Sequence, residues 1–385
     1  MSDQRKVLLA MSGGVDSSVA AALLLRAGYQ VVGCFMRLGS PGDELEGLVD
    51  ADTACRAGDA KVRLRIGHQG CCSINDAADA RLVAAKLGIP FYVCNFQSDF
   101  GRIIDYFASE YAAGRTPNPC VRCNDWLKFG KLHEYAASID AGFVASGHYA
   151  RIGRDERGQP TLLRGLDRSK DQSYVLFGAR RERLDQMLFP VGEYQKPEIR
   201  RMAKDFELPV SEKPDSQEIC FVPDNDYAGL LARRDPGSVR PGRIVDRRGV
   251  VVGEHPGHQH FTVGQRRGLS IAAARPLYVI AKNAATNTVV VGEREDLFAA
   301  GCECDDANWL LDAAFAAPDA EGWVSCDVAI RYNAEPVPAR VRARGERGLE
   351  IRFADPQAAV APGQAAVCYR GDAVLCGAWI TRATE

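Results

Sequence analysis

Residues 6–28, KVLLAMSGGVDSSVAAALLLRAG, join a short apolar run to a glycine-containing turn and then to a second, longer apolar segment. The opening KVLLAM predicts a buried strand, and VDSSVAAALLLR has the spacing of a helix that ends near Gly28. YQVVGCFMRL, residues 29–38, predicts another strand, and the alternation recurs at 79–96 and 126–151. Strands that alternate with helices predict a parallel sheet covered by helices on both faces.

The chain changes character after about residue 210. Glycine and proline punctuate short segments there, and from about residue 286 the pattern is one of strands only. Several short strands at regular spacing predict a small β-barrel. We therefore expect an α/β domain over 1–210, a small mixed linking domain over 211–285 and a β-barrel over 286–385. Residues 39–70 lack this periodicity and predict a long mobile insertion.

Composition places the chain among ordinary globular proteins. Of its 385 residues, 46% are hydrophobic and 25% are charged, and no apolar run approaches the roughly 18 residues of a membrane span. The N-terminus leads almost at once into a strand, so we expect no signal peptide, no membrane association and a cytoplasmic location. In that setting thiols stay reduced, and clusters among the 13 cysteines are interpreted as metal-binding or catalytic.

Charge is unevenly spread along the chain. The formal net charge is −2, but residues 233–248 hold six arginines against two aspartates, and residues 331–352 hold six arginines against three glutamates. Local basic stretches in a near-neutral chain favour a polyanion that binds one face. Scattered, solvated arginines are the alternative interpretation.

The turn between the first strand and the first helix, MSGGVDSS (Met11–Ser18), has the features of an anion site. Gly13 and Gly14 let backbone N–H groups approach an anion, and the helix N-terminus adds a positive dipole. Asp16 suits a Mg²⁺ ion bound to a phosphate better than it suits a bare phosphate. The segment matches neither a Walker loop nor G-x-G-x-x-G, and a capped helix after a tight turn is the structural alternative.

The S-G-G-x-D-S pattern resembles the pyrophosphate loop of N-type ATP pyrophosphatases, which cleave ATP between the α- and β-phosphates. GRTPNPCVRCN, ASGHYAR, KDQSYVL, DSQEICFVP, FTVGQRRGL, IRYNAEPVPA and PGQAAV follow in the order of the tRNA-specific 2-thiouridylases. The resemblance covers nearly the whole chain apart from the insertion. It implies an N-terminal domain of the adenine-nucleotide α-hydrolase type and ATP-dependent 2-thiolation of the wobble uridine of tRNA.

The resemblance also implies roles for individual residues. ATP contacts are implied for Ala10, Met11, Ser12, Gly13, Gly14, Val15, Asp16, Ser17, Met36 and Gly147. Contacts with tRNA are implied for Asn118, Pro119, Cys120, His148, Lys170, Asp171, Gln172, Arg331, Tyr332 and Gln364. Cys123 and Cys220 match the two catalytic cysteines, and Asp16 is expected to hold Mg²⁺.

The implied reaction has two steps. Uridine O2 attacks the α-phosphate of ATP, and sulfur carried by a cysteine then attacks C2 of the activated base. The base must be unstacked for this chemistry. The family's substrates are lysine, glutamate and glutamine tRNAs, and its sulfur comes from a donor such as a cysteine desulfurase or a sulfur-relay protein.

The segment TPNPCVRCN, Thr116–Asn124, departs from a common form of the family in which position 120 is aspartate. Cys120, Cys123 and Cys220 therefore supply three thiols. They could hold a [4Fe-4S] cluster with one open iron, they could include a persulfide relay between Cys123 and Cys220, or they could bind zinc. The other cysteines that we weighed are interpreted as structural: Cys34, Cys71, Cys72, Cys94, Cys302, Cys304, Cys368 and Cys376.

Two other functions remain open from the sequence. Another ligase of the ATP pyrophosphatase superfamily would use the loop but would not need Cys123 and Cys220. A non-catalytic RNA-binding iron–sulfur protein would need the cysteines and the arginines but not the phosphate loop. The presence of all three features together favours the thiolation enzyme.

Overall fold

The computed structural model describes residues 5–39, 74–215, 222, 227–234, 237, 239–311 and 318–385. Nearly all of the predicted insertion at 39–70, and Cys220, lie outside these described residues.

The N-terminal part is a parallel five-stranded sheet, as the alternation of strands and helices predicted. Its strand order is β3-β2-β1-β4-β7. The strands are β1 (Lys6–Ala10), β2 (Gln30–Arg37), β3 (Phe91–Asn95), β4 (Phe143–Ser146) and β7 (Met187–Leu188). The main helices are α1 (Val15–Arg26), α2 (Ile74–Leu87), α3 (Gln97–Ala112), α5 (Leu132–Ser138) and α6 (Lys196–Asp205).

Alternate residues of β1 serve opposite faces of this sheet. Val7 and Leu9 pack with residues of α1, α2 and α6. Leu8 and Ala10 pack with residues of α3 and α5 on the other face. Strand β1 is therefore buried on both faces, which is why its sequence is an uninterrupted apolar run.

The strand order places a binding site before any side chain is considered. The chain moves from β1 outward to β2 and β3, and then returns to build β4 and β7 on the other side of β1. Open parallel sheets bind ligands beyond the carboxyl ends of their strands, where the order reverses. That point lies between the ends of β1 and β4, at Ala10 and Ser146.

The central part is a four-stranded mixed sheet in the order β10-β11-β8-β9. Its strands are β8 (Gly242–Val245), β9 (Val251–His255), β10 (Tyr278–Asn283) and β11 (Thr288–Gly292), and α7 (Tyr227–Arg234) precedes them. The boundary that we placed at residue 286 assigned β11 to the barrel. That assignment is wrong, because β11 pairs with β10 and β8, and a short strand does not reveal its partners in the sequence.

The C-terminal part is a closed antiparallel barrel of six strands, in agreement with the predicted fold class. The strand order is β12-β15-β14-β13-β16-β17, and a β12–β17 pairing closes the ring. The strands are β12 (Phe298–Trp309), β13 (Val324–Ala329), β14 (Val337–Arg344), β15 (Gly348–Ala358), β16 (Ala365–Arg370) and β17 (Ala373–Thr384). Its core buries four thiols, those of Cys302, Cys304, Cys368 and Cys376.

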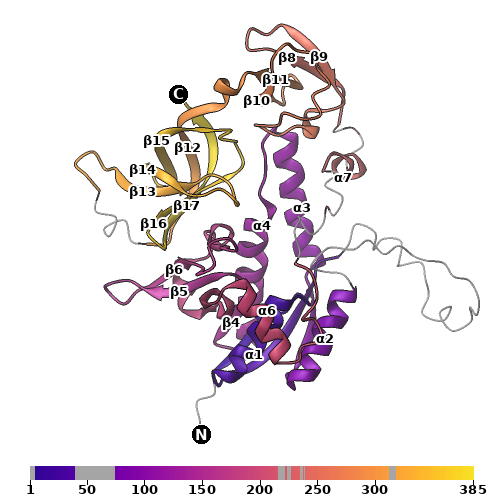
Figure 1. Ribbon diagram of the computed structural model, residues 1–385, viewed down its shortest axis with the longest axis vertical. Coiled ribbons are helices and arrows are strands. Elements are labelled where there is room, and N and C mark those ends of the chain that lie inside the picture. The colour runs from indigo at the N-terminus through magenta and orange to yellow at the C-terminus, as the bar shows by residue number, and fades with distance from the viewer. Residues whose placement is uncertain are drawn as a thin grey trace, which may run out of the picture.

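The barrel joins the N-terminal part through a hairpin. Strands β5 (Ala150–Arg154) and β6 (Pro160–Arg164) belong to the same eight-stranded sheet as the barrel, because Leu163 pairs with Ala373 of β17. Figure 1 shows α3 running from the parallel sheet up to the central sheet, with the barrel to one side. The short elements are α4 (Pro119–Arg122), a π-helix (Cys123–Lys131) and 3₁₀ turns at Ser173–Leu176, Arg181–Gln186, Pro190–Glu193, His258–His260 and Arg294–Leu297.

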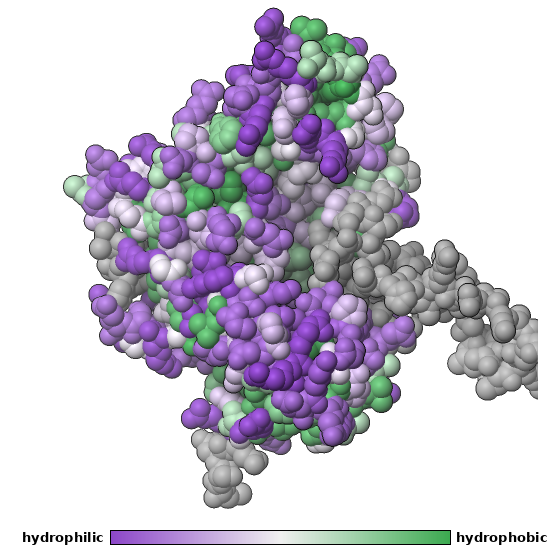
Figure 2. Space-filling view, viewed as in Figure 1, coloured by the Kyte–Doolittle hydropathy of each residue, from purple (hydrophilic) through white to green (hydrophobic). Residues whose placement is uncertain are grey.

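The surface of the molecule is mainly polar. Figure 2 shows hydrophilic residues over most of one face and a hydrophobic group at the outer end of the central sheet. Val250 and Val251, at the start of β9, are among the large hydrophobic residues exposed to solvent. Within the described ranges, no helix combines the length and hydrophobicity that a membrane span requires.

Candidate functional site

A cavity of about 710 Å³ lies at the carboxyl ends of β1, β2 and β4, at the expected reversal of strand order. One wall is the turn that leads into α1, and the opposite wall comes from the barrel. The N-terminal lining includes Ala10, Met11, Ser12, Gly14, Val15, Asp16, Ser17, Met36, Cys123, Gly147 and His148. The barrel contributes Ala329, Tyr332, Asn333, Ala334, Glu335, Pro336 and Tyr369.

The turn before α1 leaves backbone donors facing this cavity. Gly13 has φ +71°, a left-handed conformation that a side chain would strain. Gly14 caps α1 without any side-chain hydrogen bond, so no side chain of the cap satisfies the first N–H groups of the helix. Ser17 Oγ accepts from Ser12 N at 3.2 Å and donates to Gly14 O at 3.2 Å, which shapes the turn. Such a turn suits an anionic ligand.

Gly147 brings β4 against the start of α1. A Cβ at this position would lie 2.6 Å from Ser17 N and 2.8 Å from the carbonyl carbon of Asp16. Both are backbone atoms, so they cannot move aside as the end of a flexible side chain can. The close approach is therefore available only to glycine.

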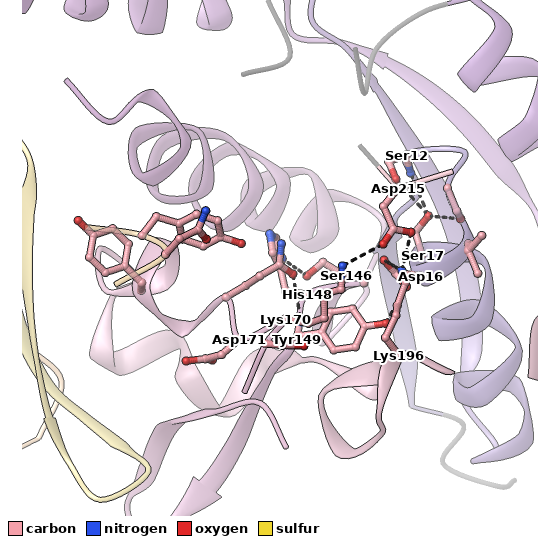
Figure 3. A pocket seen from close by; sticks show the side chains of 18 of the residues that line it. Ser12, Asp16, Ser17, Ser146, His148, Tyr149, Lys170, Asp171, Lys196 and Asp215 are labelled. Atoms are coloured by element: carbon pink, nitrogen blue, oxygen red, sulfur yellow. Dashed lines mark hydrogen bonds and ion pairs between the residues drawn. The ribbon is translucent and has the colours of Figure 1, made fainter. Parts of the chain in front are cut away.

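Asp16 is the centre of a charged network that the sequence did not reveal. Lys196 Nζ lies 2.7 Å from Asp16 Oδ1 and 2.8 Å from Oδ2, and Tyr149 donates its O–H to Oδ1 at 2.8 Å. Figure 3 shows these three side chains converging at one end of the cavity. Burial, followed by the Asp16 charge, raises the pKa of Tyr149, so this phenol stays protonated and acts as a donor.

A second carboxylate, Asp215, gathers three cations. Its oxygens lie 3.0 Å from Lys196 Nζ, 3.1 Å from Lys170 Nζ and 2.6 Å from Arg200 Nη2. Burial alone would raise the pKa of Asp215, but Lys196 and Lys170 outweigh it and lower the pKa. The end of the cavity next to the turn before α1 therefore holds several ammonium groups, and such groups suit a polyphosphate.

Lys213 ties the same loop to α2. Its Nζ contacts Asp76 Oδ1 and Asp79 Oδ2 at 2.6 Å each, and it donates to Gly13 O at 3.0 Å. Burial alone would lower the pKa of Lys213, but the two carboxylates outweigh it and raise the pKa. Lys213 therefore remains a cation and fixes the position of Gly13.

His148 lies on the far side of the cavity as a neutral base. Burial, with help from the nearby Lys128 charge, lowers its pKa well below the usual value. Ser146 Oγ lies 2.6 Å from His148 Nδ1, and Lys128 Nζ lies 3.4 Å from Nε2. Because the ammonium of Lys128 can only donate, we assign the ring proton to Nδ1, which donates to Ser146 Oγ.

Local capping residues begin the short helix that carries the C-x-x-C segment. Asn118 caps α4 by accepting from Val121 N at 3.4 Å, and Pro119 occupies the first helical position. A π-helix begins at Cys123, a rare form of helix that is frequent at functional sites. Lys128 follows Cys123 by five residues, which is the hydrogen-bond spacing of a π-helix, and both side chains line the cavity.

The structure gives the residues predicted for tRNA contact two kinds of position. Lys170, Asp171, Gln172, His148 and Tyr332 line the cavity. The Asp171 carboxylate is used locally, because it accepts from Arg164 Nε at 2.9 Å, from Gly165 N at 3.0 Å and from Ser173. The remaining predicted residues, Asn118, Pro119, Cys120, Arg331 and Gln364, are not among the lining residues.

The arginine-rich stretch at 331–352 is more neutral in the structure than its sequence predicted. Its barrel arginines pair with carboxylates on the same surface: Arg340 with Asp319, Arg342 and Arg352 with Glu350, Arg344 with Glu303, and Arg347 with Asp306. The local positive charge is therefore largely compensated, and the interpretation of solvated arginines fits this stretch better.

The sequence missed Lys196, Asp215, Tyr149, Lys213 and Lys128. Tyr149 and Asp215 lie in two of the quoted motifs, but no role was assigned to them, and Lys196 meets Asp16 across 180 residues of chain. The only signal was position: Tyr149 sits inside the ASGHYAR motif, directly after the matched Gly147 and His148.

The expected cofactors are Mg²⁺ and an iron–sulfur cluster. Asp16 offers a hard oxygen ligand beside the phosphate turn, and that donor fits Mg²⁺. Across the ranges that the structure describes, no group of three or more His, Cys, Asp or Glu side chains is arranged to hold a metal ion. Cys220 lies outside those ranges, so the three-thiol set stays a prediction.

Three family models match consecutive parts of the chain. They are a tRNA methyl transferase HUP domain at residues 5–224, a tRNA methyl transferase PRC-barrel domain at 233–293 and an aminomethyltransferase beta-barrel domain at 300–380.

Curated relatives match over nearly the whole length. The tRNA-specific 2-thiouridylase MnmA of Rhodopirellula baltica is 49% identical over 99% of this chain and 97% of its own. The protein of the same name from Carboxydothermus hydrogenoformans is 44% identical over 98% of each. Among solved structures, a 4-thiouridine synthetase–RNA complex with bound ATP is 16% identical with a TM-score of 0.34, covering 60% of this chain and 51% of its own. A likeness that low supports no conclusion.

Proposed function

The chain belongs to the tRNA-specific 2-thiouridylase family, and we propose that it catalyses ATP-dependent 2-thiolation of the wobble uridine of tRNA. The observation that carries the proposal is a single cavity lined by both the turn before α1, through Met11, Ser12 and Gly14–Ser17, and the thiol-bearing residue Cys123. An adenylating site and a sulfur carrier must meet at one base, and a cavity that both segments line supports this proposal.

Thiolation explains the site better than methyl transfer does, although two of the matching domain models carry methyl transferase names. Replacing a carbonyl oxygen with sulfur requires that oxygen to be turned into a leaving group, and ATP supplies the means. Methyl transfer needs neither a pyrophosphate site nor a thiol. The lysines around Asp16 and Asp215, and Cys123 across the cavity, therefore favour thiolation.

In the proposed first step, the uridine O2 bonds to the α-phosphorus of ATP and pyrophosphate leaves. The turn at Gly13–Ser17 would bind the phosphates through backbone N–H groups, and Lys196 and Lys170 would offset the charge on the leaving pyrophosphate. Asp16, oriented by Lys196 and Tyr149, would hold Mg²⁺. When bound, Mg²⁺ neutralises phosphate charge.

In the proposed second step, sulfur bonds to C2 of the base and AMP leaves with the former O2. If Cys123 or Cys220 carries the sulfur as a persulfide, the terminal sulfur attacks C2. The other cysteine then attacks the carrier's own sulfur, which leaves 2-thiouridine and a disulfide. The alternative source, a sulfide on an iron–sulfur cluster held by Cys120, Cys123 and Cys220, is equally part of our proposal.

The test of the function is direct assay of the product. Anoxically purified protein is incubated with ATP, a wobble-uridine tRNA transcript, and either sulfide or a cysteine desulfurase with cysteine, and 2-thiouridine is measured by mass spectrometry. We expect Cys123→Ala to abolish the product and to leave ATP binding intact. The control is Cys326→Ala, which removes a half-buried thiol of the barrel. An active Cys123→Ala protein, or an inactive wild type, would contradict the proposal.

Cys120 distinguishes the two sulfur sources. If the three cysteines hold a cluster, Cys120→Ala loses iron and activity together. Cys120→Asp keeps part of both, because a carboxylate can occupy a ligand position although it is a harder donor. If sulfur travels as a persulfide, wild type contains no iron and Cys120→Ala stays active. We expect loss of iron and activity, and full thiolation by an iron-free Cys120→Ala protein would end the cluster hypothesis.

We further propose that the enzyme acts in the cytoplasm on lysine, glutamate and glutamine tRNAs. A cysteine desulfurase or a sulfur-relay protein would supply the sulfur, and the barrel would contact the tRNA. The support is family membership together with the barrel residue Tyr332, which lines the cavity and could stack on an unstacked base. Comparing transcripts of these three tRNAs with an unrelated tRNA in the same assay tests the substrate set.

A further inference from the structure

Arg122 lies between the two cysteines of the C-x-x-C pair and is wedged between the N-terminal part and the barrel. Its guanidinium carbon is 5.2 Å from the ring centroids of both Tyr106 and Trp126. On the other side it lies 4.4 Å from the ring of Trp379, which belongs to β17 of the barrel. A planar guanidinium stacks on aromatic faces in a way that an ammonium cannot.

Two carboxylates fix the same guanidinium from the two parts of the molecule. Arg122 Nη1 is 3.8 Å from Asp125 Oδ2, and Nη2 is 3.4 Å from Asp306 Oδ2 in β12. The Arg122 side chain is only 17% exposed, so solvent screens these ion pairs less than it screens a surface pair. The guanidinium therefore bridges the helix that carries the cysteines to the barrel.

The barrel also holds the chain just before the cysteine pair. Thr116 N donates to Pro362 O at 2.8 Å, and Gln364 Nε2 donates to Thr116 O at 3.0 Å and to Pro117 O at 3.4 Å. Gly363, at φ +90°, has no room for a side chain, because a Cβ would lie 2.9 Å from Thr116 N. The segment 116–123 is thus fixed by the barrel at both ends.

The barrel contacts lie at the start of a longer helical run. Helix α4 continues directly into the π-helix Cys123–Lys131, and residues 116–118 before it belong to no helix or strand. The cavity that Cys123 lines is itself completed by the barrel residues Tyr332–Pro336. The position of the thiol relative to the base therefore depends on how the barrel is seated.

We propose that the barrel positions the C-x-x-C segment for sulfur transfer and that Arg122 is the positioning residue through which it does so. The inference rests on the function proposed above. Arg122 does not line the main cavity and would touch neither ATP nor the base. Its effect would be on the orientation of Cys120 and Cys123, and misplacing a reacting group by about 1 Å can cost about 100-fold in rate.

The experiment compares four single variants and the double variant Arg122→Met/Asp306→Asn of the full chain with wild type at a temperature well below unfolding. Arg122→Met keeps the apolar stem, Arg122→Lys keeps the charge without the planar stack, and Asp306→Asn removes the barrel's ion-pair partner. The control is Arg154→Met on β5. It breaks an exposed ion pair in which Arg154 Nη2 lies 2.9 Å from Asp185 Oδ1. Four quantities are measured: kcat, KM for tRNA, the Kd for ATP, and the alkylation rates of Cys120, Cys123 and Cys94 by iodoacetamide, resolved by mass spectrometry.

We expect Arg122→Met to lower kcat by about 10- to 100-fold and to change the alkylation of Cys120 and Cys123. Its ATP Kd and the alkylation of Cys94, a half-buried thiol on β3, should stay at wild-type values. Arg122→Lys should recover part of kcat. Asp306→Asn should act in the same direction, and its effect should shrink when Arg122 is already methionine, because the two residues are coupled.

Three results would overturn the inference. They are an unchanged kcat with unchanged alkylation of Cys120 and Cys123, a parallel change at Cys94 that marks general loosening, and an equal loss in Arg154→Met. If wild type makes no 2-thiouridine, the proposed function fails, but the alkylation rates still decide whether Arg122 positions the cysteines.

Discussion

Asp16 and Lys196 form the most consequential contact at the scale of single residues. The carboxylate is held at both oxygens by one buried ammonium group and at one of them by a phenol. The backbone of Lys196 is fixed as well, because Lys196 N donates to Asp167 Oδ2 at 2.9 Å. The carboxylate is thus oriented before any ligand arrives, and its negative charge suits a Mg²⁺ ion bound to the phosphates rather than the phosphates themselves.

This arrangement predicts the effect of Asp16→Asn. The variant should lose thiolation and tRNA-dependent pyrophosphate release by about 100-fold or more, because the carboxylate proposed to hold Mg²⁺ at the reacting phosphates is removed. Binding of tRNA should remain, and Lys196 should stay paired with Asp215. Tyr149→Phe is the matched control: it removes one donor to the same carboxylate but keeps the charge, so we expect about a 10-fold effect at most. Pyrophosphate release by Asp16→Asn at the wild-type rate would refute this role.

His133 gives a prediction about pH. Burial, assisted by the Arg183 charge, lowers the pKa of His133 to about 4, and its Nε2 has no hydrogen-bond partner in the described part of the chain. The unfolded chain binds a proton near pH 6.5 and the folded chain near pH 4, so protonation in this window favours unfolding. Stability is complete above pH 6.5 and falls toward pH 4, by up to about 3 kcal/mol from this side chain.

Chemical denaturation at several pH values checks the contribution of His133. His133→Leu should flatten the fall in unfolding free energy between pH 6.5 and pH 4. His260→Leu, at an exposed histidine, should keep the wild-type slope. Identical slopes for wild type and His133→Leu would contradict the prediction.

Strand β4 shows how a single element shapes the site. It begins after Gly142 and ends before Gly147, and only at Gly147 would an added Cβ meet another element. A Cβ at Gly142 would meet nothing within 4 Å, whereas one at Gly147 would lie 2.6 Å from the backbone of α1. The two glycines therefore form a matched pair on one strand.

We expect Gly147→Ala to weaken ATP binding by about 10-fold or more, because β4 and the start of α1 must separate and the phosphate turn must shift. Gly142→Ala should bind ATP as wild type does. Calorimetric titration with ATP measures both. Equal affinities in the two variants would show that the close approach at Gly147 does not shape the site.

The whole molecule should bind tRNA through its phosphates, although its net charge is −2. Neutralised phosphates release counterions, so log affinity should fall linearly with log salt concentration. Because the other arginines of the 331–352 stretch are paired with barrel carboxylates, we expect Arg331, which donates to Ala358 O, to contribute more to the slope. Arg331→Met should reduce the slope by about one unit.

The control for the salt series is Arg26→Met, at the end of α1 opposite the cavity. It should keep the wild-type slope. Filter-binding titrations from low to physiological salt measure all three proteins. A binding constant that does not change with salt would exclude phosphate-driven docking.

The sequence by itself determined the features that depend on neighbours along the chain. Short-range signals of this kind are the apolar run at 6–11, the helical spacing after Gly14, and Gly28 at the end of that helix. They predicted the parallel sheet and the anion-binding turn before α1. Asn118 and Pro119 are a further short-range signal, because Asn118 caps α4 and Pro119 occupies its first position. Ordered motifs then identified the family across nearly the whole chain.

Only the tertiary structure decided which distant residues meet. Lys196 reaches Asp16 because α6 packs beside α1, and Arg122 reaches Asp306 across 184 residues because the barrel seats against α4. The pairing of β11 with the central sheet and the neutralised barrel arginines depend on the same long-range geometry. Periodicity and capping act over a few residues, whereas an ion pair depends on where the whole chain places its two ends, and no local pattern encodes that distance.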